Sequence, residues 1–379
     1  MSGYFLAPRI AWGTGALEQV SSLGLRQAFL LVDPNVARRD GHRRLVEELA
    51  KSDTATTVEV ASETSNDIPD IDRRFDQLRP HPPDALLGVG GGRTIDAVKA
   101  LGFRFERPDL SLAAMPALLD GPTESPPRVI AVPTTSGSGA EASWTADLRN
   151  ADGAPVEVAH RSLVPEWAIV DPEFAAGLSP DRVMDGAVQS LALATEAFLS
   201  AWSNPFSDAL AVDAATTIVQ RLAHAIRWSD DPDARSALHY AATSAGLAAS
   251  NAQRGLAHAL ARALERPTGL PYGRLLGIAL PSVLDFDHPS ARERLEILGR
   301  SARASEENGA TPFAQRVRRL LDQLHFPATV RAAGVPLDGW DDHRAAVVAL
   351  TLRSPAALAN PRVASAAEVG SLLDGIVGR

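Results

Sequence analysis

The stretch GLAHALARALERPTGLPYG, residues 255–273, joins a helical pattern to side chains that could carry chemistry. Its one histidine, His258, stands near the start, and a metal site built on a helix would place a second ligand one turn later. That position holds Arg262, which shares a helix face with the histidine and is no metal ligand. Near the end stands Tyr272, whose phenol can give a proton to a carbonyl oxygen. The residues alone leave three interpretations open: a metal site, a former metal site, or a plain helix with a packed histidine.

A second segment, GVGGGRTIDAVKA at residues 88–100, indicates phosphate binding. Its glycines fall between an apolar strand pattern and a helical pattern, and glycine lets backbone amides approach a ligand closely. The start of the following helix adds free N–H groups and a partial positive charge, which suit a pyrophosphate. A tight turn without a ligand is the alternative. The predicted cofactor-binding residues of this segment are Gly90, Gly91, Gly92, Thr94 and Asp96.

Two further polar features follow apolar runs, as expected at strand ends. PTTSGSGAEAS, residues 133–143, offers the hydroxyls of Thr134, Thr135 and Ser138, and ligands of open α/β sheets bind at such ends. Capping of a helix is the alternative role of the serine. Asp33 closes the first clear strand pattern, where an acidic residue binds the adenine ribose and repels a 2′-phosphate. It therefore favours NAD over NADP, and a plain turn before the next proline is the alternative.

These segments belong to a regular alternation of elements. Apolar strand patterns occur at residues 28–33, 85–92, 129–135 and 167–172, with helical patterns at 41–52 and 94–103. Alternating strands and helices predict a parallel, doubly wound, Rossmann-like α/β domain in residues 1–175, with a loop insertion at 104–127. Residues 176–379 predict an all-α domain. Its helices are expected at 181–201, 205–227, 233–250, 252–265, 290–304, 310–324 and 341–352.

The composition excludes several classes of protein. The chain has 379 residues, of which 45% are hydrophobic and 22% charged, as in a globular protein. Its formal net charge of −9 provides no positive field for nucleic acid or anionic lipid, and no run of about 18 apolar residues predicts a membrane span. The lack of cysteine excludes disulfides, thiolate metal sites and a cysteine nucleophile. The first residues show no signal-peptide pattern, so we expect a cytoplasmic protein.

The order of these motifs resembles that of the iron-containing (group III) alcohol dehydrogenase family, which includes maleylacetate reductases. The resemblance implies an N-terminal NAD(P)-binding domain, a helical C-terminal domain, and an active site in the cleft between them. It also implies hydride transfer between the nicotinamide and a carbonyl or alcohol, and a dimer or larger oligomer. The matching segments are WGTGAL (12–17), LVDPNV (31–36), GVGGGRTIDAVKA (88–100), VPTTSGSGAEAS (132–143), AIVDPEF (168–174), ATEAFLS (194–200), GLAHALARALERPTGLPYG (255–273) and LPSVLDF (280–286).

The metal-binding positions implied by the resemblance are mostly changed in this chain. The family uses an aspartate, a histidine four residues later, the histidine of a GxxHA stretch, and a histidine just before a downstream glycine. Aligned on Glu196 in ATEAF, these positions fall on Gln189, Leu193, His258 and Tyr272. A further histidine that the family often has falls on Arg262. Since a catalytic metal needs about three protein ligands, we expect none here.

The first functional hypothesis is a metal-independent NAD(P)H-dependent reductase of an aldehyde, ketone or enol-ketone, with NAD(H) preferred. His258, Tyr272 and Arg262 are its predicted catalytic residues, and a homodimer is expected. The neighbouring arginines 254, 266 and 274 would suit a small anionic substrate that bears a carboxylate or phosphate. Arg93, where the family usually has serine, could contact a cofactor phosphate or crowd it.

Two other hypotheses remain. In the second, the dinucleotide cleft persists in a repurposed non-redox enzyme, such as a lyase, cyclase or dehydratase, or in a catalytically silent family member. In the third, the chain is a metal enzyme whose ligands are shifted along the sequence. A shift of one helical turn would gain Asp185 as a ligand, but it would place the first histidine on Gln189.

Overall fold

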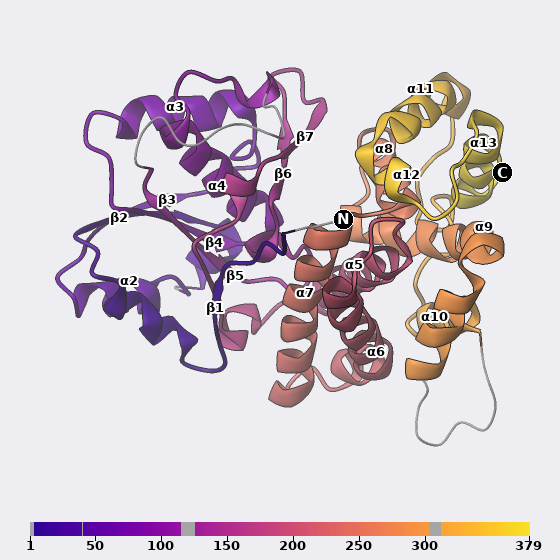
Figure 1. Cartoon of the computed structure of the whole chain (residues 1–379), viewed down its shortest axis with the longest axis horizontal. Helices are drawn as coiled ribbons and strands as arrows, with labels where there is room; N and C mark the ends of the chain where they lie inside the picture. The colour runs from indigo at the N-terminus through magenta and orange to yellow at the C-terminus, as the bar shows by residue number, and fades with distance from the viewer. Residues whose placement is uncertain (1–3, 40, 115–125, 303–311) are drawn as a thin grey trace. The chain divides into compact units, whose positions relative to one another are not determined.

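The computed structural model describes residues 4–39, 41–114, 126–302 and 312–379. The chain forms two compact units, Met1–Leu178 and Ser179–Arg379, compared with the predicted domains 1–175 and 176–379. The first unit is an α/β structure and the second is helical (Figure 1). The predicted fold class is therefore confirmed. No helix in the described part of the chain is both long and apolar enough to cross a membrane.

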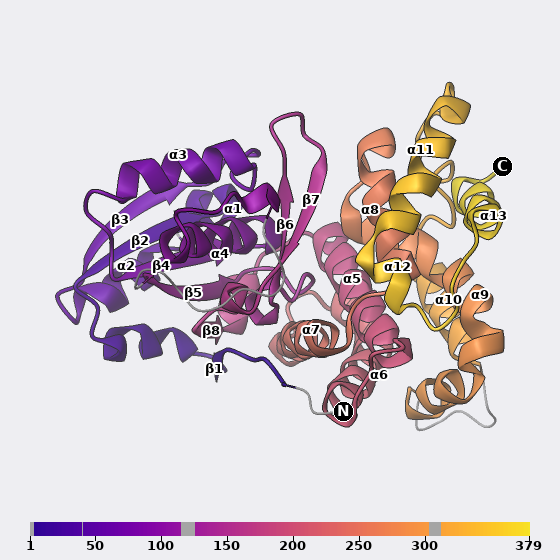
Figure 2. The same ribbon diagram turned by 45° about the horizontal axis from the view of Figure 1, so that its top comes forward.

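The first unit is built on a six-stranded parallel sheet with the order β1-β8-β5-β4-β2-β3. Helices cover both of its faces, with α3 and α4 on one side and α2 on the other (Figure 1). A two-stranded antiparallel hairpin, β6 and β7, projects from this sheet (Figure 2). The strands are β1 Arg9–Trp12, β2 Gln27–Val32, β3 Ala55–Val60, β4 Ala85–Gly90, β5 Arg128–Pro133, β6 Thr145–Arg149, β7 Pro155–Ala159 and β8 Trp167–Val170. The helices are α1 Pro34–Arg38, α2 Arg43–Ala50, α3 Ile68–Leu78 and α4 Gly92–Glu106.

Alternating side chains of the central strands divide between two cores. On β2, Phe29 and Leu31 pack with α3 and α4, whereas Leu30 and Val32 pack with α2. Strand β4 is buried along its whole length, as expected for a central parallel strand covered on both faces. The continuous apolar runs in the sequence therefore reflect burial on both sides of the sheet.

The order of the strands creates a ligand-binding position between β2 and β4. After β2 the chain adds β3 on one side, then crosses to place β4, β5 and β8 on the other. In open α/β sheets, ligands bind at such a switch point, beyond the carboxyl ends of the strands. Asp33 follows β2 directly, and its amide donates to the Val89 carbonyl of β4 at 2.8 Å. The residue that ends β2 and the turn that ends β4 thus lie at the same edge.

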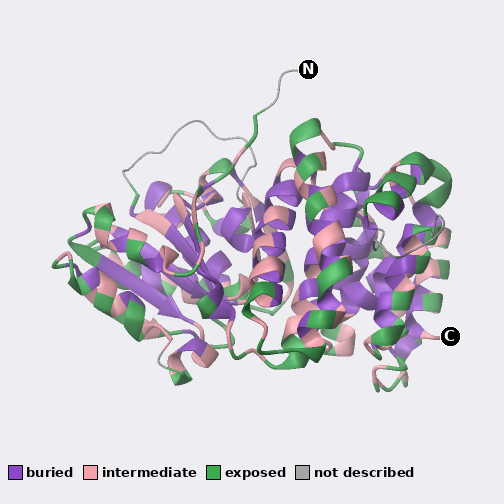
Figure 3. Ribbon diagram, turned by 90° about the horizontal axis from the view of Figure 1, so that it is seen from below, coloured by how far each residue is buried: buried purple, intermediate pink, exposed green. Residues whose placement is uncertain are grey.

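The second unit consists of helices whose starts are clearly encoded. Helices α5, α6 and α7 each begin with a proline preceded by a capping side chain, Ser179, Asn204 or Asp231. Figure 3 shows the buried residues in the interior of this helical unit and the exposed ones toward its outside, and residues 190–199 of α5 are buried on every side. The helices are α5 Pro180–Leu199, α6 Pro205–Arg227, α7 Pro232–Ala252, α8 Leu256–Thr268, α9 Tyr272–Ser301, α10 Phe313–Gln323, α11 Trp340–Arg353, α12 Pro355–Ala359 and α13 Ala366–Val377.

Several elements differ from the sequence-based prediction. The helix expected at 290–304 is the second half of α9, which begins at Tyr272 and contains Pro281 and Pro289. Prolines usually end helices, so the first half was missed; here the helix continues with a local kink at Ala291. Helix α13 and the edge strand β3 were not predicted. Of the expected loop insertion, 104–106 complete α4, and 115–125 lie outside the described residues.

Candidate active site

The glycine turn between β4 and α4 is closely surrounded by predicted site residues. A Cβ on Gly90 would lie 2.7 Å from the Thr94 Cβ and 2.9 Å from the Asp33 Cβ. Neither distance is compatible with a side chain at position 90. Asp33, Gly90 and Thr94 therefore lie together at the switch point, in a close approach that leaves no room for a side chain at position 90.

The loop after β5 covers the other side of the same turn. A Cβ on Gly91 would lie 3.3 Å from the Thr135 Oγ1, and one on Gly92 would lie 2.9 Å from the Ser138 Cβ. Thr134 is held to the turn through its amide, which donates to the Gly90 carbonyl at 3.0 Å. Helix α4 begins after Gly91 with no side chain capping it. Its first N–H groups, ringed by hydroxyls, form a site suited to a phosphate.

Asp33 also has a local structural role. It caps helix α1, and its Oδ1 accepts from the Asn35 amide at 2.8 Å and the Asn35 Nδ2 at 2.9 Å. The Asn35 Oδ1 in turn accepts from Arg38. The cap explains why a short helix begins at this point. It does not conflict with a ribose-binding role, because a carboxylate has two oxygens and about four acceptor sites.

Asp96 has a different environment from the other predicted cofactor residues. Its Oδ2 accepts the Asp147 amide at 3.1 Å, and its Oδ1 lies 3.4 Å from the Nζ of Lys99. Lys99 is fully buried and also donates to the carbonyls of Ala140 and Thr145 at 2.9 and 2.5 Å. Burial raises the pKa of Asp96 to about 6, and the Lys99 charge opposes that rise. The structure thus places Asp96 in a buried cluster that joins α4 to β6, and its contact with the cofactor stays a prediction.

Arg93 lies exposed in the first turn of α4, next to the glycine turn. Burial raises the pKa of Asp67, and the positive charges of Arg149 and Arg93 oppose this rise. Arg93 therefore acts electrostatically on Asp67, at the start of α3.

In the second unit, His258 is held by a carboxylate from another helix. Its Nδ1 is hydrogen-bonded to the Oε2 of Glu196, and both side chains are buried, at 2% and 3% exposure. The same carboxylate accepts the amides of Gly255 at 2.9 Å and Ala257 at 2.5 Å. Glu196, on α5, thus caps the start of α8 and orients the histidine ring in one interaction. Within the described part of the chain, the His258 Nε2 is buried without a hydrogen-bond partner.

The two other predicted catalytic residues lie beside His258. The ring of Tyr272, at the start of α9, contacts the His258 ring edge-on, with centroids 6.0 Å apart. Its hydroxyl donates to the His258 backbone carbonyl at 3.4 Å. The Arg262 guanidinium lies over the tyrosine ring, 5.8 Å from its centroid, and pairs with Glu265 at 3.0 Å. The structure therefore brings the predicted catalytic set together.

The side chains at the family's metal positions do not fit a divalent metal. Gln189 is half-buried on α5, and Leu193 belongs to the apolar core of the helical unit. Among the residues that the structure describes, no three His, Asp or Glu side chains converge to hold a metal ion. A single imidazole nitrogen is too few donors for a catalytic site. We therefore assign no step of the reaction to a metal.

Asp185, the ligand that a shifted alignment would supply, is already engaged. Its two oxygens accept from the Nε and Nη2 of Arg274 at 2.5 and 3.2 Å. Burial raises the pKa of Asp185, and the arginine opposes this rise. A bidentate pair of this kind joins α5 to the start of α9. Asp185 is thus paired with Arg274, whereas the hypothesis of a metal enzyme with shifted ligands needs Asp185 to bind the metal.

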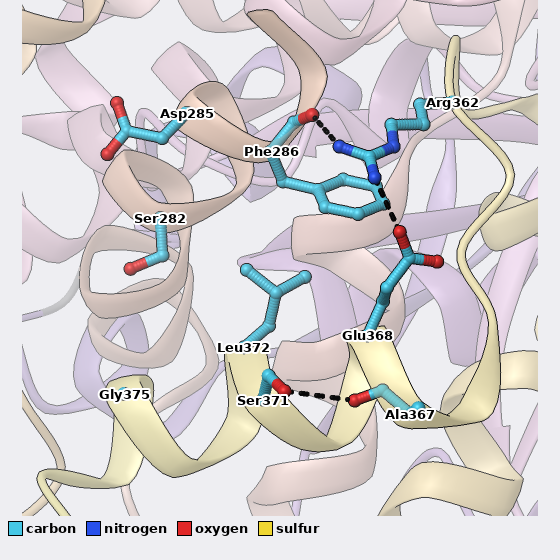
Figure 4. A pocket seen from close by; sticks show the side chains of 9 residues that line it. All are labelled: Ser282, Asp285, Phe286, Arg362, Ala367, Glu368, Ser371, Leu372 and Gly375. Atoms are coloured by element: carbon cyan, nitrogen blue, oxygen red, sulfur yellow. Dashed lines mark hydrogen bonds and ion pairs between the residues drawn. The ribbon is translucent and has the colours of Figure 1, made fainter.

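A groove of about 540 Å³ lies elsewhere in the helical unit, between α9 and α13 (Figure 4). Arg362 crosses it, donating to the Phe286 carbonyl and pairing with Glu368. Asp285 at its rim pairs with Arg318. The charged side chains that line this groove thus have protein partners, and we assign it no part in the chemistry.

Sequence reasoning overlooked Glu196, Asn360 and Asp287 as site residues. Asn360 accepts the Leu256 amide at 3.0 Å and donates to Asp287 at 2.6 Å, so it adds a second clamp at the start of α8. Burial raises the pKa of Asp287 to about 7. Acidic residues inside otherwise apolar helices, such as Glu196 in ALATEAFL, were the available signal. Their partners stand 59 or more positions away, which no local pattern reveals.

Comparison with known proteins supports the resemblance over the whole chain. The iron-containing alcohol dehydrogenase family matches residues 7–172, and the C-terminal domain of the Fe-containing alcohol dehydrogenase family matches residues 183–377. Among curated proteins, a probable alcohol dehydrogenase of Salmonella typhimurium, EutG, is 29% identical over 377 residues, covering 97% of this chain and 92% of that protein. The 1-propanol dehydrogenase PduQ of Citrobacter freundii is 26% identical, covering 99% of both chains. An NADPH-dependent butanol dehydrogenase of Clostridium saccharobutylicum is 26% identical over 87% of both.

Solved structures share the fold along the full chain. An alcohol dehydrogenase from Oenococcus oeni superposes with a TM-score of 0.90 at 21% identity, covering 99% of this chain and 100% of that one. A sulfoacetaldehyde reductase from Bifidobacterium kashiwanohense, solved in complex with NAD+, gives a TM-score of 0.86 at 21% identity, covering 100% and 99%. The family matches extend through both units, so this chain belongs to the iron-containing alcohol dehydrogenase family and is an oxidoreductase.

Proposed function

We propose that this protein is a metal-independent NAD(P)H-dependent reductase of a carbonyl compound, with NAD(H) preferred to NADP(H). The observation that carries the proposal is the environment of His258. Where relatives hold a metal, this chain has one imidazole, fixed by Glu196, with a buried nitrogen that finds no partner in the described structure. Such an arrangement suits proton transfer to or from a substrate oxygen.

The residues that would hold the cofactor are those at the switch point of the sheet. The amides at the start of α4 and the hydroxyls of Thr135 and Ser138 would bind the pyrophosphate. Asp33 would accept the hydroxyls of the adenine ribose, which supports NAD(H). When bound, the reduced nicotinamide supplies a hydride. Since one relative is named as NADPH-dependent, the preference for NADH is a feature proposed for this chain alone.

The proton would come from the helical unit. His258 would exchange it at Nε2, and the Tyr272 hydroxyl would turn from the His258 carbonyl to hydrogen-bond the same oxygen. Arg262 would supply positive charge near that oxygen, weakened by its pair with Glu265. In this proposal, these side chains and the cofactor-binding residues act on the same substrate molecule.

We also propose a small anionic substrate. Fewer arginines are suited to bind it than the sequence suggested. Arg274 pairs with Asp185, so its charge is already balanced, and Arg266 lies exposed. Arg262, which pairs with Glu265, and Arg254 are both half-buried, and we propose that these two side chains would bind a carboxylate. We expect glyoxylate, a carboxylate-bearing aldehyde, to be reduced with a lower KM than propanal, a neutral aldehyde of similar size.

The test starts with chelator-treated protein. NADH is titrated and followed by nicotinamide fluorescence, with NADPH as the comparison, and NADH oxidation is then measured with propanal and glyoxylate. Binding and turnover without metal support the proposal. Binding without turnover of any carbonyl favours a silent or repurposed member. Activity that disappears with chelator and returns with Fe²⁺ or Zn²⁺ would show that the metal positions have been misassigned.

A further inference from the structure

The start of α8 is held in place by a strained link. Gln253, between α7 and α8, has φ 77° and ψ 155°, a backbone region that is almost exclusive to glycine. A non-glycine residue there costs about 1–3 kcal/mol and persists only where its surroundings enforce it. The strain lies five residues before His258.

Hydrogen bonds on both sides of the link enforce this conformation. At the end of α7, the Ala252 carbonyl accepts from Ser200, and the Asn251 carbonyl accepts from the Asn204 side chain at 2.9 Å. At the start of α8, the first amides donate to Glu196 and Asn360. Gly255 has no room for a side chain, because its Cβ would lie 2.9 Å from the Glu196 carboxylate and 3.0 Å from the Asn360 Oδ1. Partners from three other segments thus fix the helix turn that carries His258.

The bond between Glu196 and His258 also selects one form of the imidazole. A carboxylate only accepts hydrogen bonds, so the proton of the neutral ring must be on Nδ1. The other nitrogen, Nε2, then carries the lone pair and is buried with no partner among the described residues. A buried polar atom without a partner is costly and is expected where a ligand completes the bond.

We propose that Glu196 is a positioning residue that holds His258 in the Nδ1–H tautomer, so that Nε2 is the atom that exchanges a proton with the substrate oxygen. This inference rests on the proposed reductase function. In reduction, the carbonyl carbon gains the hydride and the carbonyl oxygen gains the electron pair of the π bond. The Nε2–H bond of the imidazolium then breaks, the O–H bond of the alcohol forms, and the nitrogen keeps its electron pair. The product is the neutral Nδ1–H imidazole, which must regain a proton before the next turnover.

The tautomer can be measured in the unaltered protein. The chain has 9 histidines, so protein labelled with nitrogen-15 at histidine would be compared with the His258→Gln variant to assign the signals. Neutral His258 should show a protonated Nδ1 and an unprotonated Nε2. The reverse pattern would overturn the proposal without any need for enzymatic activity.

The matched variants are Glu196→Gln and Thr195→Val. The Glu196 carboxylate accepts hydrogen bonds from three N–H groups, and the NH₂ group of a glutamine cannot accept any of them. The glutamine would therefore face one of these N–H groups with its own NH₂, and the preference of His258 for the Nδ1–H tautomer should be lost. Thr195 is the preceding residue, fully buried, with a hydroxyl that has no described partner, so valine is a near-isosteric control. We expect kcat for NADH oxidation to fall about 100-fold in Glu196→Gln and less than about 3-fold in Thr195→Val. The Kd for NADH should stay unchanged in both.

The outcomes separate this inference from the proposed function. A normal kcat in Glu196→Gln, while His258→Gln loses about 100-fold, would show that the histidine works without its positioning residue. Failure of the wild type to oxidise NADH with either aldehyde would overturn the proposed function and the proton-transfer role with it. The tautomer would still be decided by the spectrum alone. Loss of NADH binding in Glu196→Gln would reveal a general folding defect, and the wild-type spectrum would then decide the tautomer.

Discussion

At the scale of single residues, the charge on Asp33 should decide the choice of cofactor. Replacement by Asn removes the charge but leaves an oxygen that can still cap α1 through the Asn35 amide. We expect the Kd for NADPH to fall and that for NADH to rise, each by about 10-fold, because a hydrogen bond to a charged group contributes about 1.5–3 kcal/mol.

Fluorescence titration of both cofactors measures this effect, and the melting temperature reports on the cap. Asp33→Ala is the control that removes charge and cap together, so it should also lower the melting temperature. An unchanged ratio of the two dissociation constants in Asp33→Asn would remove Asp33 from the cofactor site.

A second residue-scale prediction concerns Asp287, buried behind the start of α8. Its pKa is raised by burial from 3.8 to about 7, so the native state retains a proton that the unfolded state loses between these values. The free energy of unfolding therefore falls as pH rises through this window. Asp287→Asn keeps the acceptor for Asn360 and removes the charge. Its stability advantage over the wild type should grow from near zero below pH 4 to at most about 4 kcal/mol above pH 7.

Urea unfolding of the two proteins at pH 4, 5.5 and 7.5 tests this. Burial lowers the pKa of His239 to about 4, so its contribution to the free energy of unfolding is lost as pH falls below 6.5. Because His239 is present in both proteins, this contribution cancels in the difference between them. A difference that does not depend on pH would show that Asp287 is ionised throughout.

At the scale of elements, the α7–α8 link offers a prediction about strain. Gln253→Ala removes the hydrogen bond from the Arg254 amide to the Gln253 Oε1 at 3.0 Å but leaves the residue in its strained conformation. Gln253→Gly loses the same bond and relieves the strain. The glycine variant should be more stable than the alanine variant by about 1–2 kcal/mol, measured by urea unfolding. Equal stabilities would mean that the link is not strained.

The elements also show how far sequence reasoning could go. The glycine turn and the starts of α5 to α7 were predictable, because they depend on glycine geometry and on a capping side chain followed by proline. The first half of α9 was not, since the packing of the helical core outweighs the cost of Pro281 within it. The buried contact of Asp96 was not predictable for a similar reason: its partner amide at Asp147 stands 51 positions away.

At the scale of the whole molecule, we predict a homodimer. Strand β1 forms one edge of the six-stranded sheet, where it pairs with β8, and an exposed edge strand is a template for pairing with a second chain. Trp12, which ends it, is 71% exposed. Light scattering after gel filtration should give the mass of two chains for the wild type and of one chain for Trp12→Glu. A wild-type monomer would contradict the prediction, and Val60→Glu, on the opposite edge strand β3, is the matched control.

Residue types and their spacing were enough to predict the fold class, the family and the glycine turn, and to propose that Gln189, Leu193 and Tyr272 stand where the family has metal ligands. These features are local, because they depend on periodicity, on glycine and proline, and on which side chains can donate to a metal. The tertiary structure alone decided that His258 is oriented by Glu196, 62 positions away, and that Asn360 joins Asp287, 73 positions away. Hydrogen bonds between buried side chains require both helices to be packed before their geometry exists. The likeness to metal enzymes is therefore encoded locally, whereas the arrangement that would replace the metal is made only by folding.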